Sequence, residues 1–308
     1  MSVTPRADAD GGWKDIIEAF TEDFFQFFFP DVHAAIDFSR GVEFLDTELR
    51  RCVADARVSQ RQADRLLRAY LKSGEEQWLL IHIEVQGDTR ESAGEFAERM
   101  FIYNYRIYDL YRRRDLMSLA VLTDASPSFR PREHRHGCFG SILTFVFPSV
   151  KLIDFNVDEL DRSDNPFARA TEVHLGYLKL GMADARTRST AKLSLSRRLY
   201  ERGHRREEVI GVLLFIDALM RLPGPLELQY RNDLDQIEGE YNMPYMSTFE
   251  KHARLDSRRE DVIDALEARF GEIPYTLRES ISHVNDDAKL KQLHRQAVLV
   301  KSLDELKV

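Results

Sequence analysis

The spacing of apolar residues predicts that the chain opens with an amphipathic helix. Between Trp13 and Phe29, large apolar side chains recur every three or four positions, which places them on one face of a helix. We expect Pro30, directly after this run, to end the helix. The first 12 residues are small, polar and charged without any periodicity, and we expect them to be disordered.

The strongest strand pattern in the chain is WLLIHIEVQ, at residues 78–86. Successive side chains of a strand point to opposite faces. One face would carry Leu79, Ile81, Ile83 and Val85, and the other Leu80, His82, Glu84 and Gln86. The second face is apolar at its start and polar at its end, whereas an edge strand in water is usually polar along its exposed face. We therefore expect a central strand whose C-terminal end opens onto a cleft.

The segments around this strand predict an α/β fold with a mixed sheet. VEFLDTELRR and ADRLLRAYLKSG are short β-like segments that precede the strand, and Ser73-Gly74 predicts a hairpin turn into it. Residues 93–114 have the spacing of a long amphipathic helix, LMSLAVLTD at 116–124 reads as a buried strand, and another strand-like segment begins at Ser141. Hairpins give antiparallel neighbours and a helical crossover gives a parallel one, so both kinds of pairing are expected.

The second half of the chain is predicted to be mostly helical. We expect one domain at residues 13–225, a charged linker at 226–257 and a small helical domain at 258–308. A Gly-x-x-Pro break at Gly271–Pro274 divides the helices of the last domain.

Composition is that of a folded protein in a reducing compartment. The chain has 308 residues, of which 43% are hydrophobic and 31% charged, enough for one large core and a small satellite domain. Cys52 and Cys138 are too few for a disulfide framework, and the N-terminus does not resemble a signal peptide, so we expect a cytoplasmic protein. No apolar run approaches the ~20 residues of a membrane helix, so no membrane partner is expected.

Charge is distributed unevenly along the chain. The net charge of −8 argues against a surface wholly dedicated to nucleic acid. Residues 186–206, however, contain eight Lys or Arg and one acid, Glu201. This run is a candidate phosphate-binding surface, with Arg197, Arg198, Arg205 and Arg206 as the expected contacts. The alternative interpretation is a solvated helix face.

Two carboxylates are expected to converge where the predicted hairpin strands begin and end. Asp64 starts the strand before the turn and Glu84 ends the strand after it. Paired carboxylates repel each other unless a hard cation lies between them, and Mg²⁺ is held by one or two carboxylates together with water and phosphate oxygens. This arrangement suits hydrolysis of a phosphodiester bond, with Mg²⁺ as the cofactor and Mn²⁺ as a substitute.

Several motifs taken together resemble a known nuclease family. EFLDTEL, ADRLLRAYLKSGEEQWLLIHIEVQ, FAERMFIYNYRIYDLY, SLAVLTD, FRP and NPFA occur in this order over most of residues 13–222. They resemble the Rpn (recombination-promoting nuclease) proteins of the PD-(D/E)XK nuclease superfamily, which also carry a transposase name. The resemblance implies a restriction-endonuclease-like core, namely a mixed central sheet flanked by helices, followed by helical segments. It also implies a Mg²⁺-dependent DNA endonuclease linked to recombination or mobile elements, and the C-terminal tail is similar to a small helical domain of unknown role.

The resemblance implies a role for each candidate residue. Asp64 matches the acid of the second motif and Glu84 the acid of the third, so these two would hold the metal. Gln86 stands where the superfamily has lysine, and an amide can position water but cannot take its proton. The acid of the first motif is expected on the opening helix, where Glu18 is the first choice and Asp15 the alternative. Dimerisation is expected by analogy with the superfamily.

Other readings of these residues remain open. Glu84 and Gln86 would also suit a buried hydrogen-bonded pair, and His82 could be a ligand, a base or a sheet histidine with its hydrogen bonds satisfied. Asp46 is expected to point outward. A non-catalytic DNA-binding or protein-interaction module that keeps the nuclease fold is the alternative function, favoured by Gln86 and the acidic net charge.

Two further motifs are weaker indications of a metal site or a nucleic-acid contact. His134, His136 and Cys138 suggest zinc, but structural zinc sites normally need four ligands and no second pair lies nearby. The tyrosines of FIYNYRIYDLYRRR could stack on bases, but their helical spacing favours packing of the helix against the core.

Overall fold

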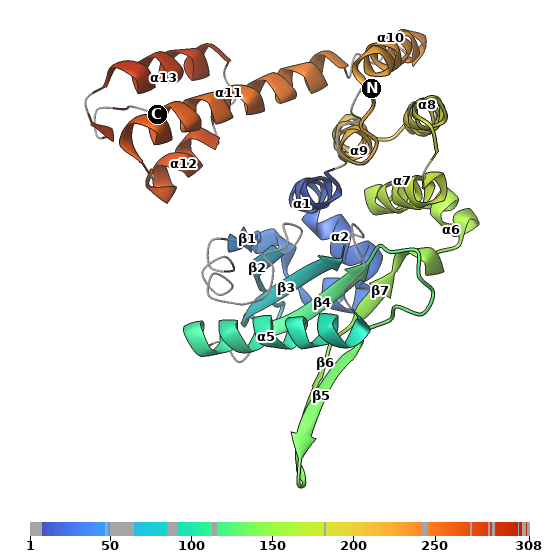
Figure 1. The fold of residues 1–308 in the computed structure, drawn as a ribbon, viewed down its shortest axis with the longest axis vertical. Helices are drawn as coiled ribbons and strands as arrows, with labels where there is room; N and C mark the ends of the chain where they lie inside the picture. The colour runs from blue at the N-terminus through green and yellow to red at the C-terminus, as the bar shows by residue number, and fades with distance from the viewer. Residues whose placement is uncertain are drawn as a thin grey trace. The chain divides into compact units, whose positions relative to one another are not determined.

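The first large unit of the protein combines a five-stranded mixed sheet with helices on both faces (Figure 1). This confirms the predicted α/β class. The chain divides into two compact units between Asp233 and Leu234, and each is described by itself. The computed structural model describes residues 8–46, 49, 65–84, 92–112, 116–181, 183–241, 246–271, 273–282, 284, 287–300, 302–303 and 306.

The main sheet has the strand order β1-β2-β3-β4-β7. Its strands are β1 (Glu43–Phe44), β2 (Arg65–Tyr70), β3 (Glu76–Glu84), β4 (Leu116–Leu122) and β7 (Ser149–Lys151). The first three pair antiparallel, while β3, β4 and β7 pair parallel. Gly74, with φ of +91°, supplies the left-handed residue of the turn between β2 and β3. The predicted hairpin and the central position of β3 are both confirmed.

Helices cover both faces of this sheet, as the alternation along β2 shows. Leu66 packs against Tyr103 and Ile107 of α5 (Ala93–Tyr111), whereas the adjacent Arg65 contacts Glu18 of α1 (Ala9–Ala19). Adjacent strand residues point to opposite faces, so α5 and α1 lie on opposite sides of the sheet. The α5 helix begins with a capping box between Ser92 and Glu95, as its sequence allows.

The helix predicted at residues 13–29 is in fact two helices, α1 and α2 (Thr21–Phe28). A further helix, α3 (Pro30–Ala35), begins at the proline expected to end the run, and the short helix η1 (Phe38–Arg40) follows it. The hydroxyl of Thr21 donates a hydrogen bond to the carbonyl of Ile17 at 2.8 Å, which satisfies a carbonyl left free where α1 ends. Helix α1 also begins at Ala9, inside the stretch expected to be disordered, and residues 1–7 lie outside the described part.

Close packing against α9 (Arg206–Leu219) explains where α1 lies. A Cβ added at Gly12 would come within 2.8 Å of the side chain of Ala218, and one at Gly211 would overlap the ring of Phe20. The two glycines therefore permit an approach that larger residues would block.

The strand-like segment expected from Ser141 is split into two strands in different sheets. Strand β6 (Ser141–Val146) pairs with β5 (Glu133–Cys138) as a separate antiparallel hairpin, and β7 joins the main sheet before the short helix η2 (Leu152–Asp154). Phe147 and Pro148 lie between the strands, and Pro148 has no N–H to donate to a strand ladder. Strand β5 was not predicted.

The remaining regular elements of the first unit, and those described in the second unit, are helices. They are α6 (Val157–Arg162), α7 (Pro166–Leu180), α8 (Ala185–Glu201), α9, α10 (Gly224–Tyr241), α11 (Met246–Phe270), α12 (Tyr275–Ser282) and α13 (Asp287–Leu299). The stretch expected to be a linker, 226–257, contains most of α10 and the start of α11 instead. Gly271, with φ of +77°, follows α11, and Pro274 precedes α12, as predicted for the break.

The second unit has a hydrophobic core of its own. Its buried members include Leu255, Val262, Leu266, Ile281, Leu290 and Leu293. In the part of the chain that the structure describes, no helix has both the length and the apolar character needed to cross a bilayer.

Candidate functional site

Strand β2 begins, and strand β3 ends, next to the positions of the predicted acids in the sequence. Arg65, which follows Asp64 in the sequence, is the first residue of β2 and pairs with Ile81 of β3. Glu84 is the last residue of β3 and lies in register with Leu122 of β4. Asp64 and Gln86 lie outside the described residues, and only the backbone of Glu84 is described. The start of one strand and the end of the other thus lie at the same end of the hairpin.

Arg65 brings two carboxylates to this end of β2. Its Nη2 donates to Oε2 of Glu18 at 2.6 Å and to the carbonyl oxygen of Lys14 at 3.0 Å. Its Nη1 donates to Oδ2 of Asp46, and its guanidinium lies 5.0 Å from the ring centre of Phe44. Only 8% of the Arg65 side chain is exposed. The planar fork of a guanidinium can serve several acceptors at once, which a lysine ammonium does less well.

This arrangement corrects the expectation for Asp46, which does not point outward. Its carboxylate turns in to Arg65, and its Oδ1 is buried with no hydrogen-bond partner among the described residues. A buried acceptor of this kind has a high desolvation cost unless it is paired. The sequence did not predict this contact of Asp46, although the residue lies in the EFLDTEL motif, because its partner Arg65 is 19 residues away in the chain.

The structure also separates the two candidates for the first acid. Glu18 contacts Arg65 at the start of β2. Asp15, one turn earlier in α1, lines a pocket of about 440 Å³ together with side chains from the α8–α10 region. Glu18 is therefore the acid that α1 presents to the hairpin.

Lys192 lines this pocket and its side chain is fully buried, although it is one of the eight Lys and Arg residues of the basic run at 186–206. Its Nζ lies 2.6 Å from Oδ1 of Asp217 and 3.1 Å from Oε2 of Glu227, and 4.2 Å from the ring centre of Tyr230. Burial raises the pKa of Asp217, and the nearby Lys192 opposes that rise. This lysine joins α8, α9 and α10 and does not contribute to the surface charge.

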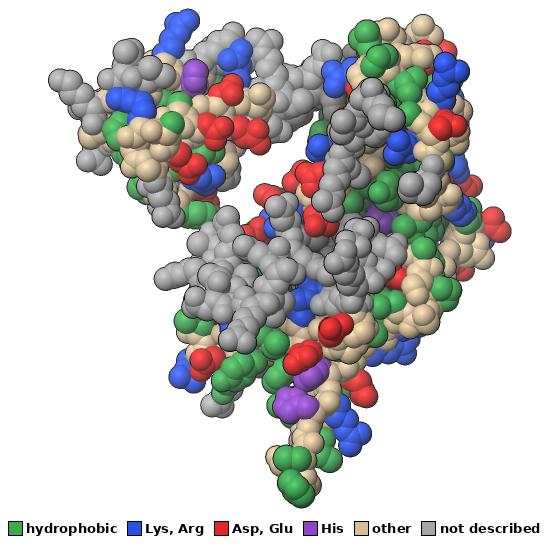
Figure 2. Space-filling model, viewed as in Figure 1, with side chains coloured by type: hydrophobic (Ala, Val, Ile, Leu, Met, Phe, Trp, Pro, Cys, Tyr) green, Lys and Arg blue, Asp and Glu red, His purple; other side chains and the backbone are tan. Residues whose placement is uncertain are grey.

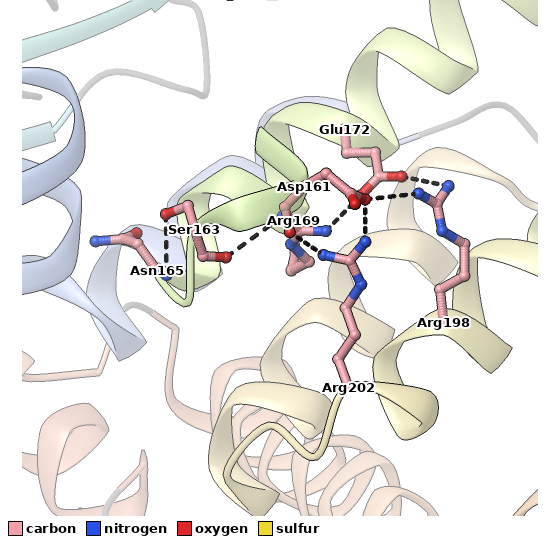
Figure 3. Close-up of polar contacts among 7 residues, drawn as sticks. All are labelled: Asp161, Ser163, Asn165, Arg169, Glu172, Arg198 and Arg202. Carbon is pink, nitrogen blue, oxygen red and sulfur yellow. Dashed lines mark hydrogen bonds and ion pairs between the residues drawn. The ribbon is translucent and has the colours of Figure 1, made fainter. Parts of the chain in front are cut away.

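Other members of the basic run form ion pairs within the protein (Figure 3). Arg198 contacts Glu172 of α7, and its Nη2 lies 3.3 Å from Oδ1 of Asp161 in α6. Arg202 also binds Asp161, and its hydrogen bond lowers the pKa of that carboxyl group. Of the four predicted phosphate contacts, Arg198 is thus engaged within the protein.

The other three predicted contacts have different settings. Arg205 donates from Nε to Oε1 of Glu208 at 2.6 Å. Arg197 lies half-buried in α8, and Arg206 is exposed as the first residue of α9.

Both histidines of β5 contact the ring of Phe101, and one of them stacks on it. Nε2 of His134 lies 2.9 Å from Nδ1 of His136, and the ring of His134 stacks on Phe101 at 5.2 Å. Among the described residues no group of three or more His, Cys, Asp or Glu side chains could hold a metal ion. The side chain of His82 is not described. Along α5, Tyr103 is buried as predicted for core packing, whereas Tyr105 and Tyr108 are exposed.

Comparison of this chain with family models, curated proteins and solved structures finds no match.

Proposed function

We propose that the protein is a metal-dependent DNA endonuclease of the Rpn type with a restriction-endonuclease-like core. The observation that carries this proposal is the arrangement of α1 and the β2–β3 hairpin. Glu18 of α1 is bound to Arg65, the residue after Asp64, and Glu84 ends the strand paired with β2. The resemblance requires this combination: an acid on the first helix beside a hairpin that carries the other two acids.

The donor set suits Mg²⁺, with Mn²⁺ as a substitute. Asp64 and Glu84 would hold the ion, since Mg²⁺ prefers hard carboxylate oxygens, and in the sequence Asp64 directly precedes β2 while Glu84 ends β3. An ion bound there would lower the pKa of its water and offset charge on the scissile phosphate. Glu18 and Asp46 are held in place by Arg65, and Gln86 would orient the attacking water without accepting its proton.

Plasmid cleavage tests the proposal. We expect purified protein to nick or cut DNA with Mg²⁺ and to stop when EDTA is added. Asp64→Ala and Glu84→Ala should each lower the rate by at least about 100-fold, because each removes a metal ligand while the core stays intact. Glu98→Ala is the matched control, since Glu98 is exposed on α5. Cleavage that persists in Glu84→Ala or in EDTA would contradict the proposed site.

The second candidate is a non-catalytic DNA-binding or protein-interaction module. Gln86 in place of lysine and the net charge of −8 favour it. It predicts that plasmid stays intact at high protein concentration with Mg²⁺, while DNA or a protein partner is still bound.

A further inference from the structure

The β5–β6 hairpin is the most exposed apolar feature of the first unit. It extends beyond the main sheet in Figure 1 and carries hydrophobic side chains out to its tip in Figure 2. Ile142 and Val146 are 60% and 66% exposed, and Phe139 at the tip is fully exposed. Phe101 of α5 covers one face only near the base. A two-stranded hairpin with so little cover is marginally stable in water.

Within the described part of the chain, the outer edge of β6 has none of the usual protection against pairing. Strand β5 carries Glu133 and Arg135, and charges of this kind discourage a further strand. Strand β6 reads SILTFV, without charge or proline and with high strand propensity. Among the described residues no third strand joins this sheet. The edge of β6 is therefore a template for another strand.

We propose that β6 pairs antiparallel with β6 of a second copy of this chain, centred on Thr144. In an antiparallel pair, side chains that lie directly opposite each other point to the same face of the sheet. The two-fold axis between two copies of β6 must therefore pass through a residue and not between two residues. In this register Ile142 lies opposite Val146 of the second copy, and Leu143 lies opposite Phe145. Thr144 lies opposite itself. Every apolar side chain of β6 meets an apolar partner, which is the pairing that stabilises neighbouring strands.

The neighbouring registers are less favourable. A centre at Leu143 places Ile142 opposite Thr144 and Ser141 opposite Phe145. A centre at Phe145 places Ile142 opposite Pro148, which cannot donate a hydrogen bond. Strand β6 is thus complementary to itself in the register centred on Thr144. For this reason the partner strand is assigned to a second copy of this chain. The product is a four-stranded sheet with the order β5-β6-β6-β5.

The interface is tested by measuring the mass in solution of the wild-type protein and of two variants with opposite charges at Thr144. The wild-type protein is expected to sediment as a dimer. Thr144→Lys and Thr144→Glu should each be monomeric, because like charges would lie opposite each other at the two-fold axis. Their mixture should recover the dimer mass, which a variant that merely misfolds would not do. A wild-type monomer at all concentrations, open-ended aggregation, or a mixture that stays monomeric would overturn the interface.

Cross-linking tests the register. In a background of Cys52→Ser and Cys138→Ser, Thr144→Cys should form a disulfide-linked dimer upon oxidation. Ile142→Cys is the matched control, since four residues of strand, about 14 Å, would separate the two copies of residue 142, too far for a disulfide. Equal cross-linking of both variants would overturn the register. The interface does not require nuclease activity, so an active monomer contradicts only the dimer and an inactive dimer contradicts only the nuclease.

Discussion

Arg65 is the residue on which the described part of the candidate site most depends. Replacing it with Ala would leave Glu18 and Asp46 near each other without their shared cation. Removing one partner of a buried ion pair is strongly destabilising, but 58% of the Glu18 side chain is exposed to solvent, which screens that contact. We expect Arg65→Ala to lower the free energy of unfolding by about 2–3 kcal/mol in urea denaturation.

Arg68 on the same strand provides the control for that substitution. It pairs with Glu43 and is 35% exposed, so Arg68→Ala should cost less than about 1 kcal/mol. If both variants lost the same free energy of unfolding, the ion pairs of Arg65 would contribute no more than that of an exposed arginine.

His174 is a second residue whose behaviour depends on burial. It lies inside the first unit, where Nε1 of Trp13 donates to its Nδ1 at 3.3 Å. Burial lowers the pKa of His174 to about 4, and a backbone contact at Thr123 opposes that shift. Between the unfolded pKa of about 6.5 and pH 4, the unfolded chain binds more protons than the folded one, so stability falls as pH falls. The loss should reach roughly 3 kcal/mol at pH 4.

Urea denaturation across this pH range tests the role of His174. The His174→Gln variant keeps an acceptor for Trp13 but cannot titrate, so its stability should depend less on pH between 6.5 and 4. An unchanged pH dependence in His174→Gln would show that this histidine is not the titrating group.

At the scale of elements, the network of Asp161, Glu172, Arg198 and Arg202 joins α6, α7 and α8 (Figure 3). Arg198→Glu would place a third acid beside two carboxylates. We expect the Tm to fall by roughly 2–6 °C in a thermal melt. Arg186→Glu makes the same charge change at an exposed position of α8 and should have little effect. Weaker DNA binding by Arg198→Glu at an unchanged Tm would instead identify a phosphate contact.

At the scale of the whole molecule, the two compact units have separate cores and should unfold separately. Leu266 is fully buried in the core of the second unit. Leu266→Ala should destabilise that unit by about 2–5 kcal/mol and shift only one of two calorimetric transitions. Leu228→Ala, at a position 63% exposed, is the control and should leave both transitions in place. A single transition that moves as a whole would contradict the independence of the cores.

What the sequence determined by itself was local. The β2–β3 hairpin, α5, β4 and the break at Gly271–Pro274 follow from periodicity and turn residues within short windows, and the structure has all four. The choice of Asp64, Glu84 and Gln86 also came from sequence, and it remains a prediction because these side chains lie outside the described part.

Only the tertiary structure decided which side chains meet. In the folded chain, Asp46 contacts Arg65, and Glu18 rather than Asp15 lies beside the hairpin. Several members of the basic run pair with acids of other helices. The tertiary structure also moved β6 out of the main sheet. These side-chain pairings depend on partners 19 or more residues away in the chain, and burial and pairing energies between such partners leave no periodic signal in the sequence around either one.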